Sequence, residues 1–141
     1  MAAGALKSLL FDRGITNIRV QSGGVGWAVG SRATDNAIKA AAASGVDISS
    51  HRSRSIGEED LEWADVVLTM TAFHWYAVTD MTDKDRVWTL TGFPDEAMGP
   101  DIDDPIGGSL EVYQQTYQEI ERELIRLVPV LEEMAQARSS A

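Results

Sequence analysis

A chain of 141 residues is long enough for one domain with a buried core and too short for two typical domains. Its formal net charge of −10 disfavours binding to nucleic acid or to an anionic membrane surface. The sequence has no cysteine, which excludes disulfides, thiolate metal sites and a thiol nucleophile within these residues.

The remaining bulk features favour a cytoplasmic protein. The absence of cysteine fits a reducing compartment, and Lys7 interrupts the first apolar run, so this run does not resemble a signal peptide. No apolar run approaches the roughly 20 residues that a membrane span needs. No His, Asp or Glu spacing suggests a metal site, and the sequence predicts no other cofactor.

The chain opens with a predicted helix and a predicted strand. Apolar residues form one helix face that ends at Gly14, namely Ala2, Ala3, Ala5, Leu6, Leu9, Leu10 and Phe11. Residues 15–21 then predict a short strand, with Ile18 and Val20 on one face.

A glycine-rich loop follows over residues 22–30. It lacks the lysine of a phosphate-binding P-loop and the spacing of a dinucleotide fingerprint. Trp27 lies among four glycines, and leaving its large ring in water would be unfavourable. Trp27 therefore either packs on the core or lines a pocket.

A second helix is predicted over residues 33–43, with Gly45 ending it. The segment His51-Arg52-Ser53-Arg54 comes next and is the one local cluster of basic residues. Its two arginines alternate as on a half-exposed extended strand, and His51 is expected to have a structural role.

The central part of the sequence alternates helices with short apolar strands. Residues 58–64 predict a short helix, and the β-branched run at residues 65–70 predicts a buried strand. Residues 72–81 predict a helix whose aromatic residues enter the core, namely Phe73, Trp75 and Tyr76. Residues 87–90 predict another strand, and a loose loop leads from there to Asp104.

The most regular pattern starts at Ser109. Apolar residues recur at steps of three and four, at Leu110, Tyr113, Tyr117, Ile120, Leu124, Leu127, Leu131 and Met134. This stripe predicts a long helix with Ser109 as its N-cap and with a kink or an end near Pro129. The turn before the helix places the carboxylate of Asp104 at a defined position beside the helix start.

Alternating helices and strands indicate an α/β domain that covers residues 1–141. We expect the strands around Val20, Val67 and Trp88 to be parallel. Functional sites in such sheets lie beyond the carboxyl ends of the strands.

Several segments together resemble the low-molecular-weight protein-tyrosine phosphatase family. They are Ser22-Gly23-Gly24, Trp27 with Val29-Gly30, Gly45-Val46-Asp47-Ile48, His51-Arg52-Ser53-Arg54, the strand at residues 64–70, and Asp104-Pro105 before the last helix. The form of residues 104–109 is most similar to the bacterial branch that includes protein-arginine phosphatases. Tyrosine-specific members usually carry aromatic residues after the proline, where this chain has Ile106 and Gly107.

The resemblance implies a three-layer α/β/α fold with a parallel four-stranded sheet. Family members begin with a buried strand and a loop of cysteine, five residues, arginine and serine, and Met1 aligns just after that loop. The first strand, which is central in the sheet, would therefore be lacking here. We expect a molten or aggregation-prone chain, or an oligomer in which another chain pairs across the gap.

The resemblance also implies a reaction and two site residues. Family members dephosphorylate phosphorylated proteins through a cysteine nucleophile, while an aspartic acid protonates the leaving group. By this resemblance Asp104 is the general acid and Trp27 lines the substrate mouth. A general acid cannot act without a nucleophile, so the chain as written is expected to be inactive.

Three interpretations follow from the sequence. The first is a phosphatase whose recorded start is misplaced at an internal methionine. The second is an inactive phosphatase-like module that binds phosphoproteins or regulates, with Arg52 and Arg54 as its candidate anion site. The third is a relative of the arsenate reductases, which ranks last because those proteins use several cysteines.

Overall fold

The computed structural model describes residues 1–26 and 29–140. Its elements, in chain order, are α1 (Ala2–Asp12), α2 (Asp35–Ala42), α3 (Glu58–Trp63), β1 (Val67–Thr69), α4 (Ala72–Thr79), the 3₁₀ helix η1 (Lys84–Arg86), β2 (Val87–Thr89) and α5 (Leu110–Ser139). Helices and a small parallel sheet confirm the predicted α/β class. Among the described residues, no helix has both the length and the apolar character needed to cross a bilayer.

The chain folds into two compact units. The helical unit consists of Met1–Gln21, Arg32–His51 and Pro105–Ala141, and the sheet unit consists of Ser22–Ser31 and Arg52–Asp104. The division falls within the turn before α5, since Asp104 is the last residue of the sheet unit and Pro105 begins the last segment of the helical unit.

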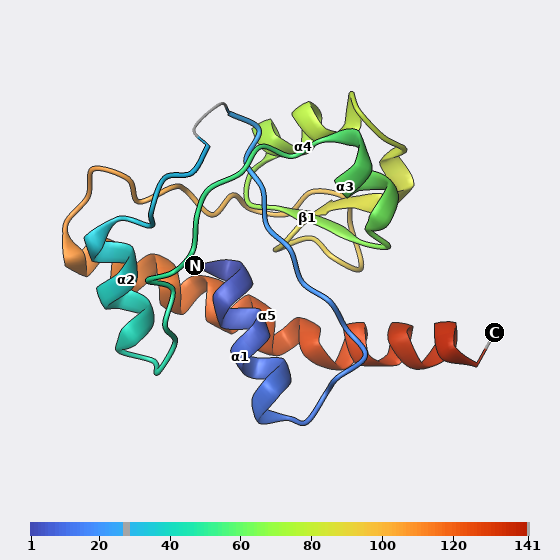
Figure 1. Ribbon diagram of the computed structural model, residues 1–141. Helices are drawn as coiled ribbons and strands as arrows, with labels where there is room; N and C mark the ends of the chain where they lie inside the picture. The colour runs from blue at the N-terminus through green and yellow to red at the C-terminus, as the bar shows by residue number, and fades with distance from the viewer. Residues whose placement is uncertain (27–28, 141) are drawn as a thin grey trace. The chain divides into compact units, whose positions relative to one another are not determined.

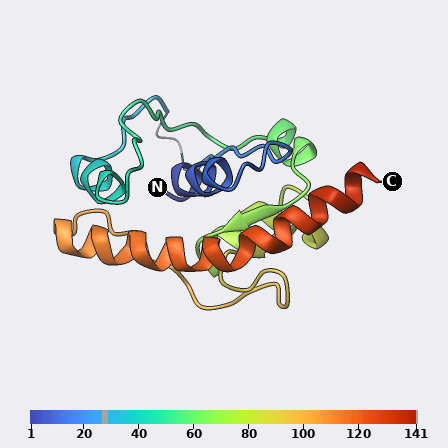
Figure 2. The same ribbon diagram turned by 90° about the horizontal axis from the view of Figure 1, so that it is seen from below.

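In the helical unit, α1 and α2 pack against α5 (Figures 1 and 2). The buried face of α5 contains Tyr113, Tyr117, Ile120, Leu124, Leu127 and Val128. This confirms the central part of the predicted stripe. The small side chains of Ala37, Ala40 and Ala41 form the buried face of α2.

The two ends of α5 test the predictions for this helix. The Ser109 hydroxyl accepts a hydrogen bond from the Val112 N–H at 3.4 Å, as expected of an N-cap. The helix continues through Pro129 to Ser139, so the predicted end near the proline is wrong. Proline removes one backbone donor, and the helix continues past this position to the half-buried Leu131 and beyond.

The sheet unit holds the parallel pair β1 and β2, with Val67 opposite Val87 and Leu68 opposite Trp88. Parallel pairing of these two segments confirms that part of the sequence analysis. The core beside the sheet contains Leu61, Trp75, Val78 and Val87. The Trp75 indole N–H also donates a hydrogen bond to the Val87 carbonyl oxygen at 3.0 Å.

The predicted strand at residues 15–21 is not a strand in the structure. Ile18 and Val20 are half-buried and Arg19 is exposed, so the predicted alternation is present without a ladder. Alternation specifies the faces of a strand, but a strand also needs a hydrogen-bonded neighbour. Within the described residues, the named sheet contains β1 and β2 alone. The missing central strand and the pairing with another chain remain predictions.

Three aromatic residues predicted on core-facing helix surfaces are exposed. Phe73 is 74% exposed and Tyr76 is 58% exposed on α4, and Phe11 is exposed on α1. An eight-residue helix turns one face inward, and on α4 Trp75 and Val78 occupy that face. The prediction that Phe73 and Tyr76 enter the core is therefore wrong.

The Tyr117 hydroxyl is the one buried side-chain polar atom without a hydrogen-bond partner among the described residues. Burial, reinforced by the negative charge of Glu121, raises the pKa of Tyr117 above its ordinary value of 10.0. The stability that depends on protonated Tyr117 is therefore complete below about pH 10 and declines as the pH rises through the folded-state pKa.

We expect Tyr117→Phe to raise the free energy of unfolding by about 1 kcal/mol at neutral pH, because it removes an unpaired buried hydroxyl. The gain should increase above pH 10, where the phenylalanine variant has no phenol to titrate. Urea unfolding at both pH values measures the difference. Tyr113→Phe, one turn earlier on the same face, is the control, and an equal gain there would contradict the assignment.

Candidate active site

The loop that carries Asp104 is held at the carboxyl end of β1. The Ile102 N–H donates to the Met70 carbonyl oxygen at 2.8 Å, and the Ile102 side chain is buried. One residue earlier, the Asp101 carboxylate accepts a hydrogen bond from the Ala72 N–H at the start of α4, also at 2.8 Å. Asp103 and Asp104 follow and are exposed. The predicted acid thus lies at the edge of a parallel sheet where functional sites are expected.

The segment before this loop is ordered, although the sequence analysis expected a loose loop. The Thr89 hydroxyl accepts a hydrogen bond from the Gly99 N–H at 2.8 Å, and the Thr89 N–H donates to the Ala97 carbonyl oxygen. The Thr91 hydroxyl donates to the Pro100 carbonyl oxygen at 2.5 Å. These bonds join residues eight to ten positions apart, and local composition gives no sign of them.

The glycine-rich loop and the basic segment lie side by side. The Gly24 N–H donates to the Arg54 carbonyl oxygen at 2.8 Å, and the Ile56 N–H donates to the Gly24 carbonyl oxygen at 2.9 Å. The Ser55 hydroxyl donates to the Gly26 carbonyl oxygen at 2.8 Å. The Gly30 N–H donates to the Ser53 carbonyl oxygen at 2.7 Å, which is consistent with the predicted extended basic segment. The isolated parallel bridge joins Gly24 to Ser55, just after that segment.

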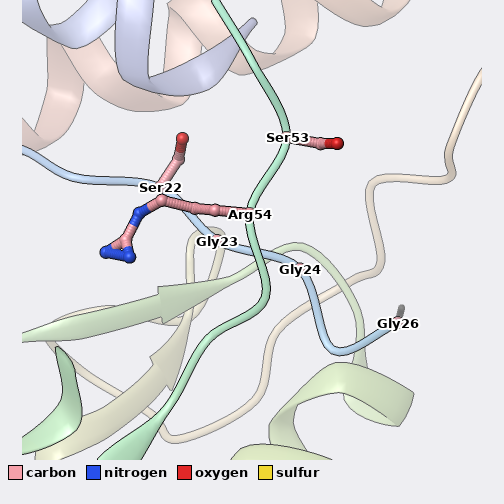
Figure 3. A pocket seen from close by; sticks show the side chains of 6 residues that line it. All are labelled: Ser22, Gly23, Gly24, Gly26, Ser53 and Arg54. Carbon is pink, nitrogen blue, oxygen red and sulfur yellow. The ribbon is translucent and has the colours of Figure 1, made fainter. Parts of the chain in front are cut away.

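A pocket of about 250 Å³ opens between these two segments (Figure 3). It is lined by Ser22, Gly23, Gly24, Gly26, Ser53 and Arg54. The side chains of Ser53 and Arg54 leave the backbone in opposite directions in this view. Trp27, predicted to line the substrate mouth, lies outside the described residues, and Asp104 is not among the lining residues.

Arg54 forms an ion pair with Asp60. Its guanidinium donates to Asp60 through both terminal nitrogens, with the Nη1–Oδ1 distance at 3.0 Å. The second oxygen of Asp60 accepts a hydrogen bond from the Gly57 N–H at 2.9 Å, at the start of α3. Arg54 therefore joins the basic segment to a helix start, a role that the sequence analysis did not anticipate. Asp60, three residues after Gly57, has the spacing of a capping residue and could have indicated it.

Asp104 offers a carboxyl group suited to acid catalysis, and the separate pocket between the glycine-rich loop and Arg54 is the candidate place for an anion. Asp104 is exposed, so its carboxyl group is accessible to a substrate. Backbone N–H groups of a glycine-rich loop can bind phosphate oxygens. Among the described residues, no three His, Asp or Glu side chains are grouped to hold a metal ion.

Comparison with known proteins identifies the fold and the family. The profile of the family described as low molecular weight phosphotyrosine protein phosphatase matches residues 1–139. A protein-arginine phosphatase of Geobacillus stearothermophilus is 34% identical over 127 residues, which cover 89% of this chain and 84% of the relative. Another protein-arginine phosphatase, from Bacillus subtilis, is 35% identical over 128 residues, covering 89% and 83%.

A solved structure shows the same similarity. It is the YwlE arginine phosphatase in a cysteine-to-serine mutant whose active-site serine is phosphorylated. It superposes with a TM-score of 0.85 at 33% identity, covering 93% of this chain and 86% of that one. The chain therefore belongs to the low-molecular-weight phosphotyrosine protein phosphatase family.

Proposed function

We propose that this chain supplies the general acid for dephosphorylation of a phosphorylated protein. We also propose that the 141-residue polypeptide alone does not catalyse this reaction. The observation that carries this proposal is the absence of cysteine from the sequence. In the solved YwlE mutant, a serine replacing cysteine is the phosphorylated active-site residue. A cysteine nucleophile therefore cannot come from these 141 residues.

Asp104 is the proposed proton donor. In phosphoryl transfer the leaving group takes its bonding electrons from phosphorus and needs a proton to depart as a neutral molecule. Asp104 is exposed and follows an anchored residue at the end of β1, which suits a group that must reach a bound substrate. The two relatives described above, which align over 89% of this chain, are named protein-arginine phosphatases, so proteins carrying phosphoarginine are the favoured substrate class.

Phosphate release tests the first part of this proposal. The purified 141-residue polypeptide, incubated with an aryl phosphate or a phosphoarginine peptide, should release phosphate at the rate of a buffer blank. A grafted chain, defined as these residues preceded by the strand and cysteine-to-arginine loop of the Bacillus subtilis relative, should release it faster. Turnover by the ungrafted polypeptide would contradict the proposal.

A second candidate function is phosphoprotein binding without catalysis, which the pocket beside Ser22 and Ser53 favours. Its serine hydroxyls can bind phosphate oxygens, whereas the Gly24 N–H already donates to the Arg54 carbonyl oxygen. The pairing of Arg54 with Asp60 weakens this candidate, because a partnered guanidinium attracts an anion less strongly. Titration with a phosphopeptide, followed by amide chemical shifts of Gly23 and Gly24, tests it against the unphosphorylated peptide.

A further inference from the structure

We propose that Asp101 is a positioning residue that, together with Ile102, fixes the conformation of the loop bearing Asp104. This inference rests on the proposed role of Asp104 as the acid. The Asp101 side chain faces the start of α4, and no sequence pattern indicates a role for it.

Two independent contacts attach the loop to the end of β1. The carboxylate of Asp101 accepts the Ala72 N–H at 2.8 Å, at the first residue of α4. The first N–H groups of a helix have no partner within the helix, and the positive end of the helix dipole favours an anion there. Asp101 thus supplies both an acceptor and a compensating charge.

The second contact is made by the backbone. The Ile102 N–H donates to the Met70 carbonyl oxygen at 2.8 Å, directly after β1, and the Ile102 side chain is buried. One hydrogen bond would leave the segment free to rotate about it. Bonds at two successive residues, one on each side of the β1–α4 turn, leave little such freedom.

The position of these contacts in the chain matters for Asp104. Only Asp103 separates the anchored Ile102 from Asp104, and Pro105 restricts the backbone on the other side. A general acid must be held within hydrogen-bond reach of the leaving-group oxygen or nitrogen, so a mobile loop would lower the fraction of productive geometries. Asp101 therefore acts on catalysis through Asp104 without touching the substrate.

Nuclear magnetic resonance on the grafted chain tests the structural part. In Asp101→Ala, we expect amide exchange at Ala72 and Ile102 to accelerate roughly threefold to tenfold, as for a lost helix cap. The backbone order parameter of Asp104 should fall from about 0.85 toward 0.6. Asp101→Asn keeps an acceptor oxygen and should retain most of the protection.

Two internal controls separate positioning from general destabilisation. Asp103→Ala removes the neighbouring exposed carboxylate and should leave exchange at Ala72 and Ile102 unchanged. The Leu90 N–H, which donates to the Thr69 carbonyl oxygen within the sheet, should exchange at the same rate in all variants. Equal acceleration at Leu90, or none at Ala72, would overturn the proposal.

Kinetics on the grafted chain distinguishes failure of this proposal from failure of the proposed function. Asp101→Ala should lower kcat with little change in KM, and should cause no further loss when Asp104 is already asparagine. If Asp104→Asn slows the reaction and Asp101→Ala does not, the positioning role is wrong and the acid is retained. If neither variant slows it, the assignment of Asp104 itself is wrong.

Discussion

Replacing Asp104 by asparagine in the grafted chain is expected to lower the rate of phosphate release by about 10² to 10⁴. Asparagine has nearly the same shape as aspartic acid, so the loop keeps its packing. Its amide cannot donate a proton to the leaving group. The loss should be largest for substrates with basic leaving groups, because those depend most on protonation.

The measurement is kcat for two aryl phosphates whose phenols differ in acidity. Asp103→Asn is the matched control, since it removes an adjacent exposed carboxylate and should leave both rates near the starting value. If Asp104→Asn left both rates of the grafted chain unchanged, another group would be the proton donor.

The second large effect concerns the core of the helical unit. Leu127→Ala is expected to reduce the free energy of unfolding by about 2 to 5 kcal/mol, because Leu127 is completely buried on α5 and its loss leaves a cavity. A typical domain has about 5 to 15 kcal/mol of stability, so this loss is a large fraction of what holds such a domain folded.

Urea unfolding followed by circular dichroism measures this change. Ile125→Ala is the control on the same helix, because Ile125 is 45% exposed and its truncation should cost far less. Similar losses from the two substitutions would contradict the assignment of the buried face of α5.

The helices were the most predictable part of the fold. The apolar stripe and the Ser109 cap located α5 because both signals are local to the helix. The β-branched run located β1, and its parallel pairing with β2 followed from the intervening helix. Residues 15–21 show the limit of such signals, since whether a segment pairs depends on residues far away in sequence.

Side-chain placement was less predictable on short helices. Phe73, Trp75 and Tyr76 look equally suited to a core in the sequence. The hydrogen bond from the Trp75 indole to the Val87 carbonyl oxygen accompanies the inward position of that one ring. This contact joins residues twelve positions apart, so the hydrophobicity of the α4 segment could not reveal it.

The candidate site, like the fold, combines features that the sequence predicts with contacts that it does not. The turn chemistry and the family resemblance indicate Asp104 from the sequence alone, and its catalytic role remains a proposal. The bond between Asp101 and the Ala72 N–H spans 29 positions, and no short motif distinguishes such a tertiary contact from a solvent-exposed charge. The pair formed by Arg54 and Asp60 spans six positions, and the spacing of Asp60 from Gly57 is a local sign of the helix start that it joins.

Intact-protein mass spectrometry tests the central claim most directly. The 141-residue polypeptide and the grafted chain are each incubated with an aryl phosphate, quenched in acid and weighed. The account predicts a phosphoryl adduct on the cysteine of the grafted chain and an unchanged mass for the 141-residue polypeptide. A phosphoryl adduct on the 141-residue polypeptide, formed by a residue other than cysteine, would contradict it.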